Sequence, residues 1–111
     1  MKPVIVSGIQ PTGNLHIGNY LGAVKNWVDL QNSGKYQCYF FIADYHSLTG
    51  EMSGAERQEK ILNIAAELLA AGIDPKKSTL FVQSQVPGHT ESAWIFNTVT
   101  PIAELYRVTQ F

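Results

Sequence analysis

The sequence predicts an α/β fold in which a parallel β-sheet is flanked by helices. Short apolar runs typical of strands alternate with segments whose apolar residues recur at helical spacing, in the order β-α-β-α-β-α. Turn-forming residues separate these segments. Because crossovers between parallel strands are right-handed, such an order winds into a parallel sheet whose ligands bind beyond the carboxyl ends of the strands.

The first strand and the first helix are expected on either side of a polar loop. Val4 to Ser7 is a β-branched run that predicts a buried strand ending at Gly8. From Ile17 onward a helical pattern continues until Ser33-Gly34 breaks it. The apolar positions of this pattern are Ile17, Leu21, Val24 and Val28, with Tyr20 and Trp27 widening the stripe. The loop therefore opens directly into a helix.

The second strand is expected at Tyr36 to Ala43, the longest apolar and aromatic run, followed by the polar segment 44–47. The run lacks alternation, as expected for a central strand covered on both faces. Ser53 and Glu56 predict a capping box at the start of the next helix, and Gly72 predicts its carboxyl cap. The apolar face of that helix consists of Ile61, Ile64, Ala65, Leu68 and Leu69.

A third strand and two more helices complete the pattern. Thr79 to Gln83 predicts the strand, and Pro87-Gly88-His89 a break before a helix through 93–96. Pro101 suits the first turn of a last helix, with Thr100 as its cap and Glu104 near its positive end, and no stop signal appears before Phe111. We therefore expect a Rossmann-like sheet within one domain, residues 1–111.

Composition limits the function classes. The 111 residues are 45% hydrophobic and carry a formal charge of -1, so no global basic field indicates nucleic acid. Cys38 is expected to be a small buried residue. Because it is the single cysteine, the chain can form neither an internal disulfide nor a multi-cysteine metal site. Neither a signal sequence nor a run long enough to span a bilayer is present, which favours a soluble cytoplasmic protein without membrane contact.

The loop after the first strand carries the chemical signal. Residues 7–20 lack both the Gly-Lys-Ser/Thr ending of a P-loop and the three close glycines of a dinucleotide fingerprint. Gly8 and Gly13 permit unusual backbone angles and close ligand approach, and the helix that follows offers N–H groups to phosphate. His16 can donate to a phosphate oxygen whose charge grows in a transition state. Gly18 leaves room for a flat adenine ring or another backbone.

His16-Ile17-Gly18-Asn19 is similar to the HIGH signature of class I aminoacyl-tRNA synthetases. The wider segment from Gly8 to Ala23 resembles the bacterial tryptophanyl-tRNA synthetase family, which typically has Asn at the position of Asn19. Further matching blocks follow in order at 44–49, 71–75, 81–87 and 109–111. The likeness covers the whole chain.

The resemblance implies ATP-dependent activation of L-tryptophan to tryptophanyl-adenylate and its transfer to tRNA(Trp) in protein biosynthesis, with Mg²⁺ and no covalent nucleophile. The implied catalytic residues are Thr12 and His16. The implied ATP-binding residues are Gln10, Pro11, Thr12, Gly18 and Asn19. The implied tryptophan-binding residues are Val6, Gly8, Gln10, Ala43 and His46. The family is homodimeric, with an interface in the region of Trp94, Phe96 and the last helix.

Structural interpretations stand beside these roles. The glycines of the loop with Asn14 could form a simple strand-to-helix turn, and His46 could be a hydrogen-bonded structural residue. For Asp44 we favour the capping of a turn over substrate contact, and for His89 a place in a loop or interface. Packing is the expected role of the larger aromatic residues Trp27, Phe81, Trp94 and Phe96.

Parts of the family pattern have no counterpart in these 111 residues. They are the lysine-rich KMSKS loop, the acidic residue that recognises the indole N–H, and the anticodon-binding domain. We therefore expect an amino-terminal part of the catalytic domain, with a bare sheet edge and bare apolar helix faces.

Two other functions remain open. The chain could belong to another enzyme with an HxGH site, such as a tyrosyl-tRNA ligase or a nucleotidylyltransferase, or to a non-catalytic nucleotide-binding or assembly module. The sequences of segments 10–13 and 19–23 favour the tryptophanyl enzyme over another enzyme with an HxGH site.

Overall fold

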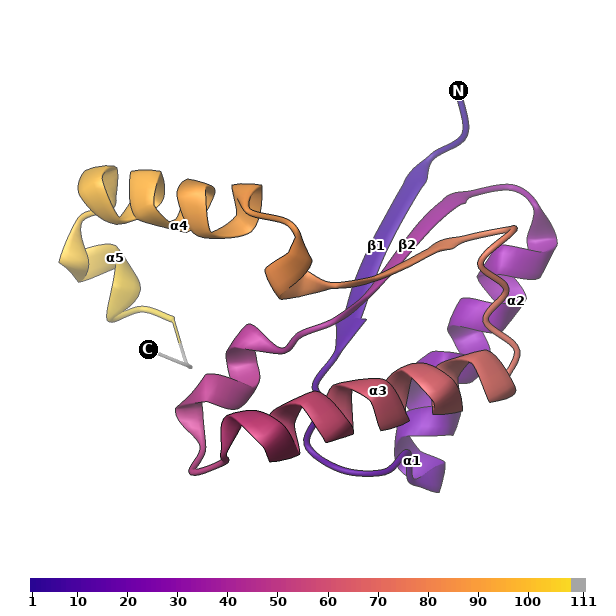
Figure 1. Cartoon of the computed structure of the whole chain (residues 1–111). Helices are drawn as coiled ribbons and strands as arrows, with labels where there is room; N and C mark the ends of the chain where they lie inside the picture. The colour runs from indigo at the N-terminus through magenta and orange to yellow at the C-terminus, as the bar shows by residue number, and fades with distance from the viewer. Residues whose placement is uncertain (109–111) are drawn as a thin grey trace.

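The computed structural model describes residues 1–108 and contains a three-stranded parallel sheet in the order β1-β2-β3 (Figure 1). The strands are β1 (Val4–Ile9), β2 (Gln37–Ile42) and β3 (Thr79–Val82). The register places Gly8 beside Phe41, and Phe41 beside Phe81. The predicted parallel sheet with flanking helices is confirmed.

The first crossover is a continuous helical segment with an irregular turn. It consists of α1 (Ile17–Asn19), the π-helical turn η1 (Tyr20–Val24) and α2 (Lys25–Ser33), and it ends at Gly34, whose φ of 65° is left-handed. Ile17 remains 70% exposed, whereas Trp27 is buried. The predicted stripe therefore fails at its start, because the wider π turn rotates the residues before it away from the face that α2 buries.

The second crossover contains the 3₁₀ turn η2 (Tyr45–Thr49) and α3 (Gly54–Ala70), whose predicted caps are both confirmed. The N–H and hydroxyl of Ser53 donate to Glu56 Oε2 at 2.9 and 2.7 Å, which lowers the pKa of that carboxyl. At the other end Gly72 has a φ of 113° and donates to the carbonyl of Leu69. The next N–H, of Ile73, reaches the carbonyl of Leu68, which completes a Schellman motif.

The core lies between the sheet and the helices α2 and α3. Its buried apolar residues are Val24, Trp27, Cys38, Phe40, Ile42, Ile64, Leu68 and Ile73. The rings of Trp27 and Phe40 stack with their centroids 4.7 Å apart. Cys38 is buried as predicted, and burial raises the pKa of its thiol. The packing of Trp27 predicted from its spacing is thus confirmed.

The other face of the sheet lacks a helical layer in the part of the chain that the structure describes. Val6 on β1 is 63% exposed, and from Cys38 to Ile42 β2 alternates between buried and half-buried residues. The expectation of a central strand covered on both faces is therefore wrong for these residues. Because the strands follow one another in one direction, right-handed crossovers place α2 and α3 on the same face.

The last two helices, α4 (Gly88–Val99) and α5 (Ile102–Leu105), extend away from the sheet (Figure 1). They follow the 3₁₀ turn η3 (Gln83–Gln85), which begins where β3 ends. The predicted break at 87–89 is too long, because Gly88 and His89 already belong to α4. Trp94 is 72% exposed and Phe96 63% exposed, so the core packing predicted for both is wrong.

The predicted last helix stops early. Pro101 directly precedes α5 and Glu104 lies in its first turn, but the helix ends at Leu105. A helix this short is marginal without packing, and Ile102 within it is 60% exposed. Thr100 ends α4 rather than capping α5 through its side chain. The predicted extension to Phe111 falls partly on 109–111, outside the described residues.

No helix within residues 1–108 combines the length and the hydropathy that a membrane crossing needs.

Candidate functional site

The loop between β1 and α1 is anchored at two points. Pro11 is fully buried, and the half-buried side chain of Leu15 packs against the core. The backbone N–H of Leu15 also donates to Glu67 Oε2 of α3 at 2.7 Å. Thr12, Gly13, Asn14 and His16 remain exposed. The backbone of the loop is therefore held against the core and α3, while the polar side chains of the loop are exposed.

His16 caps its own helix. Its Nδ1 accepts the Gly18 N–H at 3.1 Å, and its backbone N–H donates to Asn19 Oδ1 at 3.3 Å. Because Nδ1 is an acceptor, a neutral imidazole carries its proton on Nε2. No residue within 1–108 accepts from Nε2, which leaves this N–H available for a ligand oxygen.

The glycines of the loop act differently from expectation. Among the described glycines only Gly34 and Gly72 have a positive φ, so neither Gly8 nor Gly13 needs an unusual backbone angle. A Cβ on Gly18 would lie 2.9 Å from the His16 ring. The room over Gly18, expected for adenine or another backbone, is thus taken by the imidazole, which also uses one of the helix N–H groups expected for phosphate.

A small polar cavity of about 160 Å³ gathers part of the predicted ATP site. Its lining consists of Ile9, Gln10, Thr12, Gly13, Asn14, His16, Asn19 and Ile64. Four residues predicted to bind ATP or to act in catalysis therefore share one cavity. Pro11 and Gly18 do not line it. Pro11 is the buried residue of the loop, and Gly18 lies against the His16 ring.

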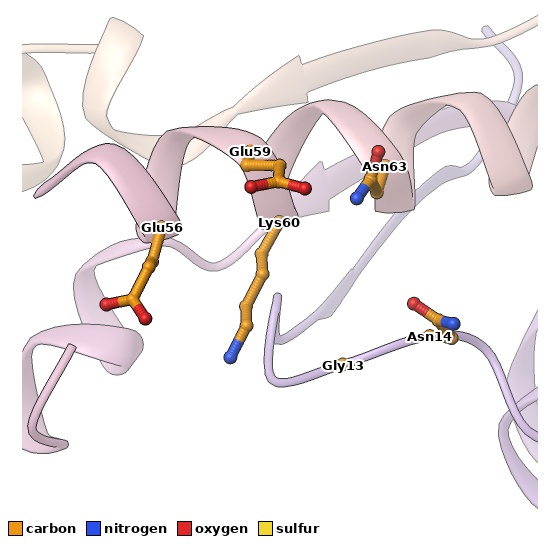
Figure 2. Close-up of a pocket in the computed structure, with 6 residues that line it drawn as sticks. All are labelled: Gly13, Asn14, Glu56, Glu59, Lys60 and Asn63. Atoms are coloured by element: carbon orange, nitrogen blue, oxygen red, sulfur yellow. The ribbon is translucent and has the colours of Figure 1, made fainter. Parts of the chain in front are cut away.

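A second, larger cleft of about 310 Å³ adjoins this cavity (Figure 2). Gly13 and Asn14 belong to both, and α3 supplies the remaining residues of the cleft, Glu56, Glu59, Lys60 and Asn63. Figure 2 shows the Lys60 side chain extending from α3 toward the loop. No cationic side chain lines the smaller cavity. Lys60 is thus a cation that borders the cavity in which ATP phosphate is predicted to bind.

Sequence reasoning missed the contribution of α3. The polar residues at 56, 60, 63 and 67 are spaced by four, three and four, which places them on one helix face. That face borders the predicted apolar stripe through Ile64. This spacing is the signal that could have revealed a polar helix surface turned toward the loop.

The residues predicted to contact tryptophan lie around the uncovered sheet face and the strand ends. Val6 and Gly8 are exposed on β1. Three ring atoms of Phe41 lie 2.5 to 2.8 Å from where a Gly8 Cβ would be. Phe41 also stacks on Phe81, with ring centroids 5.7 Å apart. Ala43 follows β2 and donates to the Ile9 carbonyl at 2.8 Å.

Two of the remaining polar residues have structural partners. The carboxylate of buried Asp44 accepts from the Ser84 N–H at 3.0 Å and joins the ends of β2 and β3, which supports the structural role that we favoured. His89 stacks on Phe81 with ring centroids 6.1 Å apart. By contrast, the exposed imidazole of His46 in η2 makes no hydrogen bond to the described chain, so it lacks the partner that a structural role requires.

The fold and the loop define a class of protein. A Rossmann-like sheet whose first strand leads through this loop to His16 at a helix mouth is the arrangement of a class I aminoacyl-tRNA synthetase catalytic domain. The family described as "tRNA synthetases class I (W and Y)" matches residues 1–111. The chain belongs to this family.

Relatives and solved structures agree with that assignment. The tryptophan–tRNA ligase of Rickettsia conorii is 50% identical over 111 residues, which are 100% of this chain and 33% of the relative. The tryptophanyl-tRNA synthetase structure from Campylobacter jejuni matches with a TM-score of 0.88 and 40% identity, over 98% of this chain and 34% of that one. A second structure from that organism, complexed with ADP and tryptophan, matches with a TM-score of 0.86 and 42% identity, over 94% and 32%. The chain thus spans about a third of the length of these proteins.

Proposed function

We propose that residues 1–111 form the amino-terminal part of the nucleotide-binding catalytic domain of a tryptophan–tRNA ligase. The carrying observation is the 50% identity to a tryptophan–tRNA ligase over the whole chain. The cavity around His16 supports it, because polar residues to which the resemblance assigns ATP binding and catalysis line this cavity together. The proposed reaction joins L-tryptophan to ATP as tryptophanyl-adenylate and then transfers tryptophan to tRNA(Trp).

The activation step consists of one displacement at phosphorus. A carboxylate oxygen of tryptophan attacks the α-phosphate of ATP, the bond to the β-phosphate oxygen breaks, and pyrophosphate leaves. Thr12 and the Nε2–H of His16 stabilise the charge on the phosphate oxygens. Gln10, Gly18 and Asn19 bind along ATP, whereas Pro11, whose ring is buried, contributes through its backbone.

Within residues 1–108, the cavity around His16 offers few ligands to a metal ion. No carboxylate lines the cavity, and residues 1–108 contain no cluster of three or more His, Cys, Asp and Glu side chains that could hold a metal. Mg²⁺ would therefore be bound mainly by the phosphates of ATP, where it neutralises part of their charge.

Tryptophan is proposed to bind near the uncovered sheet face. Val6 and Gly8 present an apolar surface there, which suits an indole, while Gln10, Ala43 and His46 lie at or beyond the carboxyl ends of the strands. Because the proposed product is used in translation, we also propose a cytoplasmic location.

ATP–pyrophosphate exchange tests the proposed function. It is measured with each standard amino acid, on this chain and on the product of the full reading frame that encodes it. We expect tryptophan-dependent exchange in the full-length product. Exchange that depends on tyrosine would identify a tyrosyl ligase instead. Absence of exchange with every amino acid would leave the nucleotidylyltransferase and the non-catalytic module.

We further propose a homodimer that is formed partly through α4 and α5. Trp94 and Val99 are 72% and 69% exposed, and no described residue covers this apolar surface. The full-length product should therefore sediment as a dimer. Trp94→Asp should shift it toward monomer, because an unpaired charge would be buried at the interface.

Leu62→Asp is the matched control, because Leu62 is similarly exposed, at 63%, but lies on α3. It should leave the sedimentation coefficient unchanged. A wild-type protein that sediments as a monomer would show that this part of the proposal is wrong.

A further inference from the structure

The carboxylate of Glu67 joins α3 to the loop of the site. Its Oε2 accepts the backbone N–H of Leu15, 52 residues earlier in the chain, at 2.7 Å. This length is at the short end for N–H···O bonds. Glu67 is half-buried, so water competes for this bond less than it would at an open surface.

The hydrogen bond fixes the backbone immediately before His16. An N–H whose direction is set also sets the plane of the peptide that links Asn14 to Leu15. The side chain of the same residue, Leu15, packs against the core. Residue 15 is therefore held through both its backbone and its side chain. The next residue, His16, begins the helix and lines the cavity.

The helix that carries Glu67 is a rigid support. It spans 17 residues, is capped at both ends, and buries Ile64 and Leu68 on either side of Glu67 in sequence. Ile64 also lines the cavity that contains His16. One face of α3 thus supplies both a wall of the cavity and the anchor of the loop above it.

We propose that Glu67 is a positioning residue, which acts through Leu15 to hold His16 in the orientation that phosphate stabilisation requires. This inference rests on the proposed function. It adds a residue that lies far from the loop in sequence and outside the HIGH-like segment. A misplacement of about 1 Å at a reacting group can cost about a hundredfold in rate, so a backbone anchor of this kind has a measurable effect on activity.

Three variants of the full-length product test the proposal. Glu67→Ala removes the acceptor, whereas Glu67→Gln keeps a carbonyl oxygen that can accept from Leu15. Glu51→Ala is the control, since Glu51 is an exposed acid before α3 that makes no hydrogen bond to the described residues. We expect Glu67→Ala to lower kcat for tryptophan-dependent pyrophosphate exchange by about tenfold or more, with KM for tryptophan within about twofold of wild type. Glu67→Gln should recover most of the loss.

Hydrogen–deuterium exchange of the segment 10–18 gives a readout that does not depend on activity. Exchange should accelerate in Glu67→Ala and stay close to wild type in Glu67→Gln and Glu51→Ala. Glu67→Asp, whose side chain is one methylene shorter and should therefore lengthen or break the contact with Leu15, replaces the alanine variant if that variant does not fold.

A wild-type kcat in Glu67→Ala, an equal loss of kcat in the glutamine and alanine variants, or unchanged exchange of 10–18 would each overturn the proposal. The two proposals fail in different ways. A wild-type protein without tryptophan-dependent exchange contradicts the proposed function, while the deuterium measurement still decides whether Glu67 holds the loop.

Discussion

Replacing His16 by alanine is expected to lower the rate of tryptophan-dependent pyrophosphate exchange by about 10²- to 10³-fold in the full-length protein. Removal of a single donor to a charge that develops in a transition state typically has this effect. The donor is the Nε2–H, because Nδ1 is occupied by the Gly18 N–H. KM for ATP should change far less than kcat, since the contact strengthens only as the phosphate charge grows.

A second substitution at the same position separates catalysis from helix capping. Asn is a good N-cap residue, so His16→Asn should keep the hydrogen bond to the Gly18 N–H but lose the Nε2 donor. It should be as slow as His16→Ala while retaining the wild-type free energy of unfolding. His16→Ala should lose about 1 kcal/mol of that free energy through the missing cap. Equal losses in ATP affinity and in rate would show that His16 is a binding residue instead.

The other large effect is expected at Gly8. A Cβ on this residue would lie 2.5 Å from the nearest ring atom of Phe41, so Gly8→Ala forces the ring to move and disturbs its stack on Phe81. The contact falls on the far end of the half-buried Phe41 side chain, on the uncovered sheet face, so the ring can move. We therefore expect a cost of about 1 kcal/mol in the free energy of unfolding, measured by denaturant titration. KM for tryptophan should rise as well, because the displaced ring lies beside the proposed indole surface.

Two companion variants test the cause of that loss. In a Phe41→Ala background the added methyl group has space, so Gly8→Ala should then cost less than about 0.5 kcal/mol. Gly13→Ala provides the comparison within the same loop, since a Cβ there meets no atom within 4 Å, and its effect on unfolding should stay within about 0.5 kcal/mol. An equal cost of Gly8→Ala in both backgrounds would refute the steric explanation.

Local signals in the sequence predicted much of the fold correctly. The capping box at Ser53, the left-handed Gly72 and the break at Gly34 each depend on residues within one or two turns, and all three appear where expected. The covered face of the sheet depends instead on the direction of both crossovers. The π turn at Tyr20–Val24 has no signal in the apolar spacing, which reads as a regular helix.

The candidate site also contains residues that local sequence signals could predict and residues that they could not. The structure places Gln10, Thr12, His16 and Asn19, which the sequence assigned to ATP binding or catalysis, around one cavity. The loop motif could not distinguish a residue that presents its side chain from one that supports the backbone, and so Pro11 and Gly18 were grouped with the others. Glu67 could not be predicted for a different reason, because its contact with Leu15 spans 52 residues and requires both the first βαβ unit and α3 to be folded.

The order of the strands also affects how the chain folds during synthesis. Each strand lies beside the one made just before it, so a newly made strand finds its partner already present when it leaves the ribosome. The sheet and its helix-covered core can therefore form progressively from the amino terminus. The apolar surface of α4 and α5 is made after the sheet and stays uncovered by the earlier elements, so it remains exposed on the newly made chain after the core has formed.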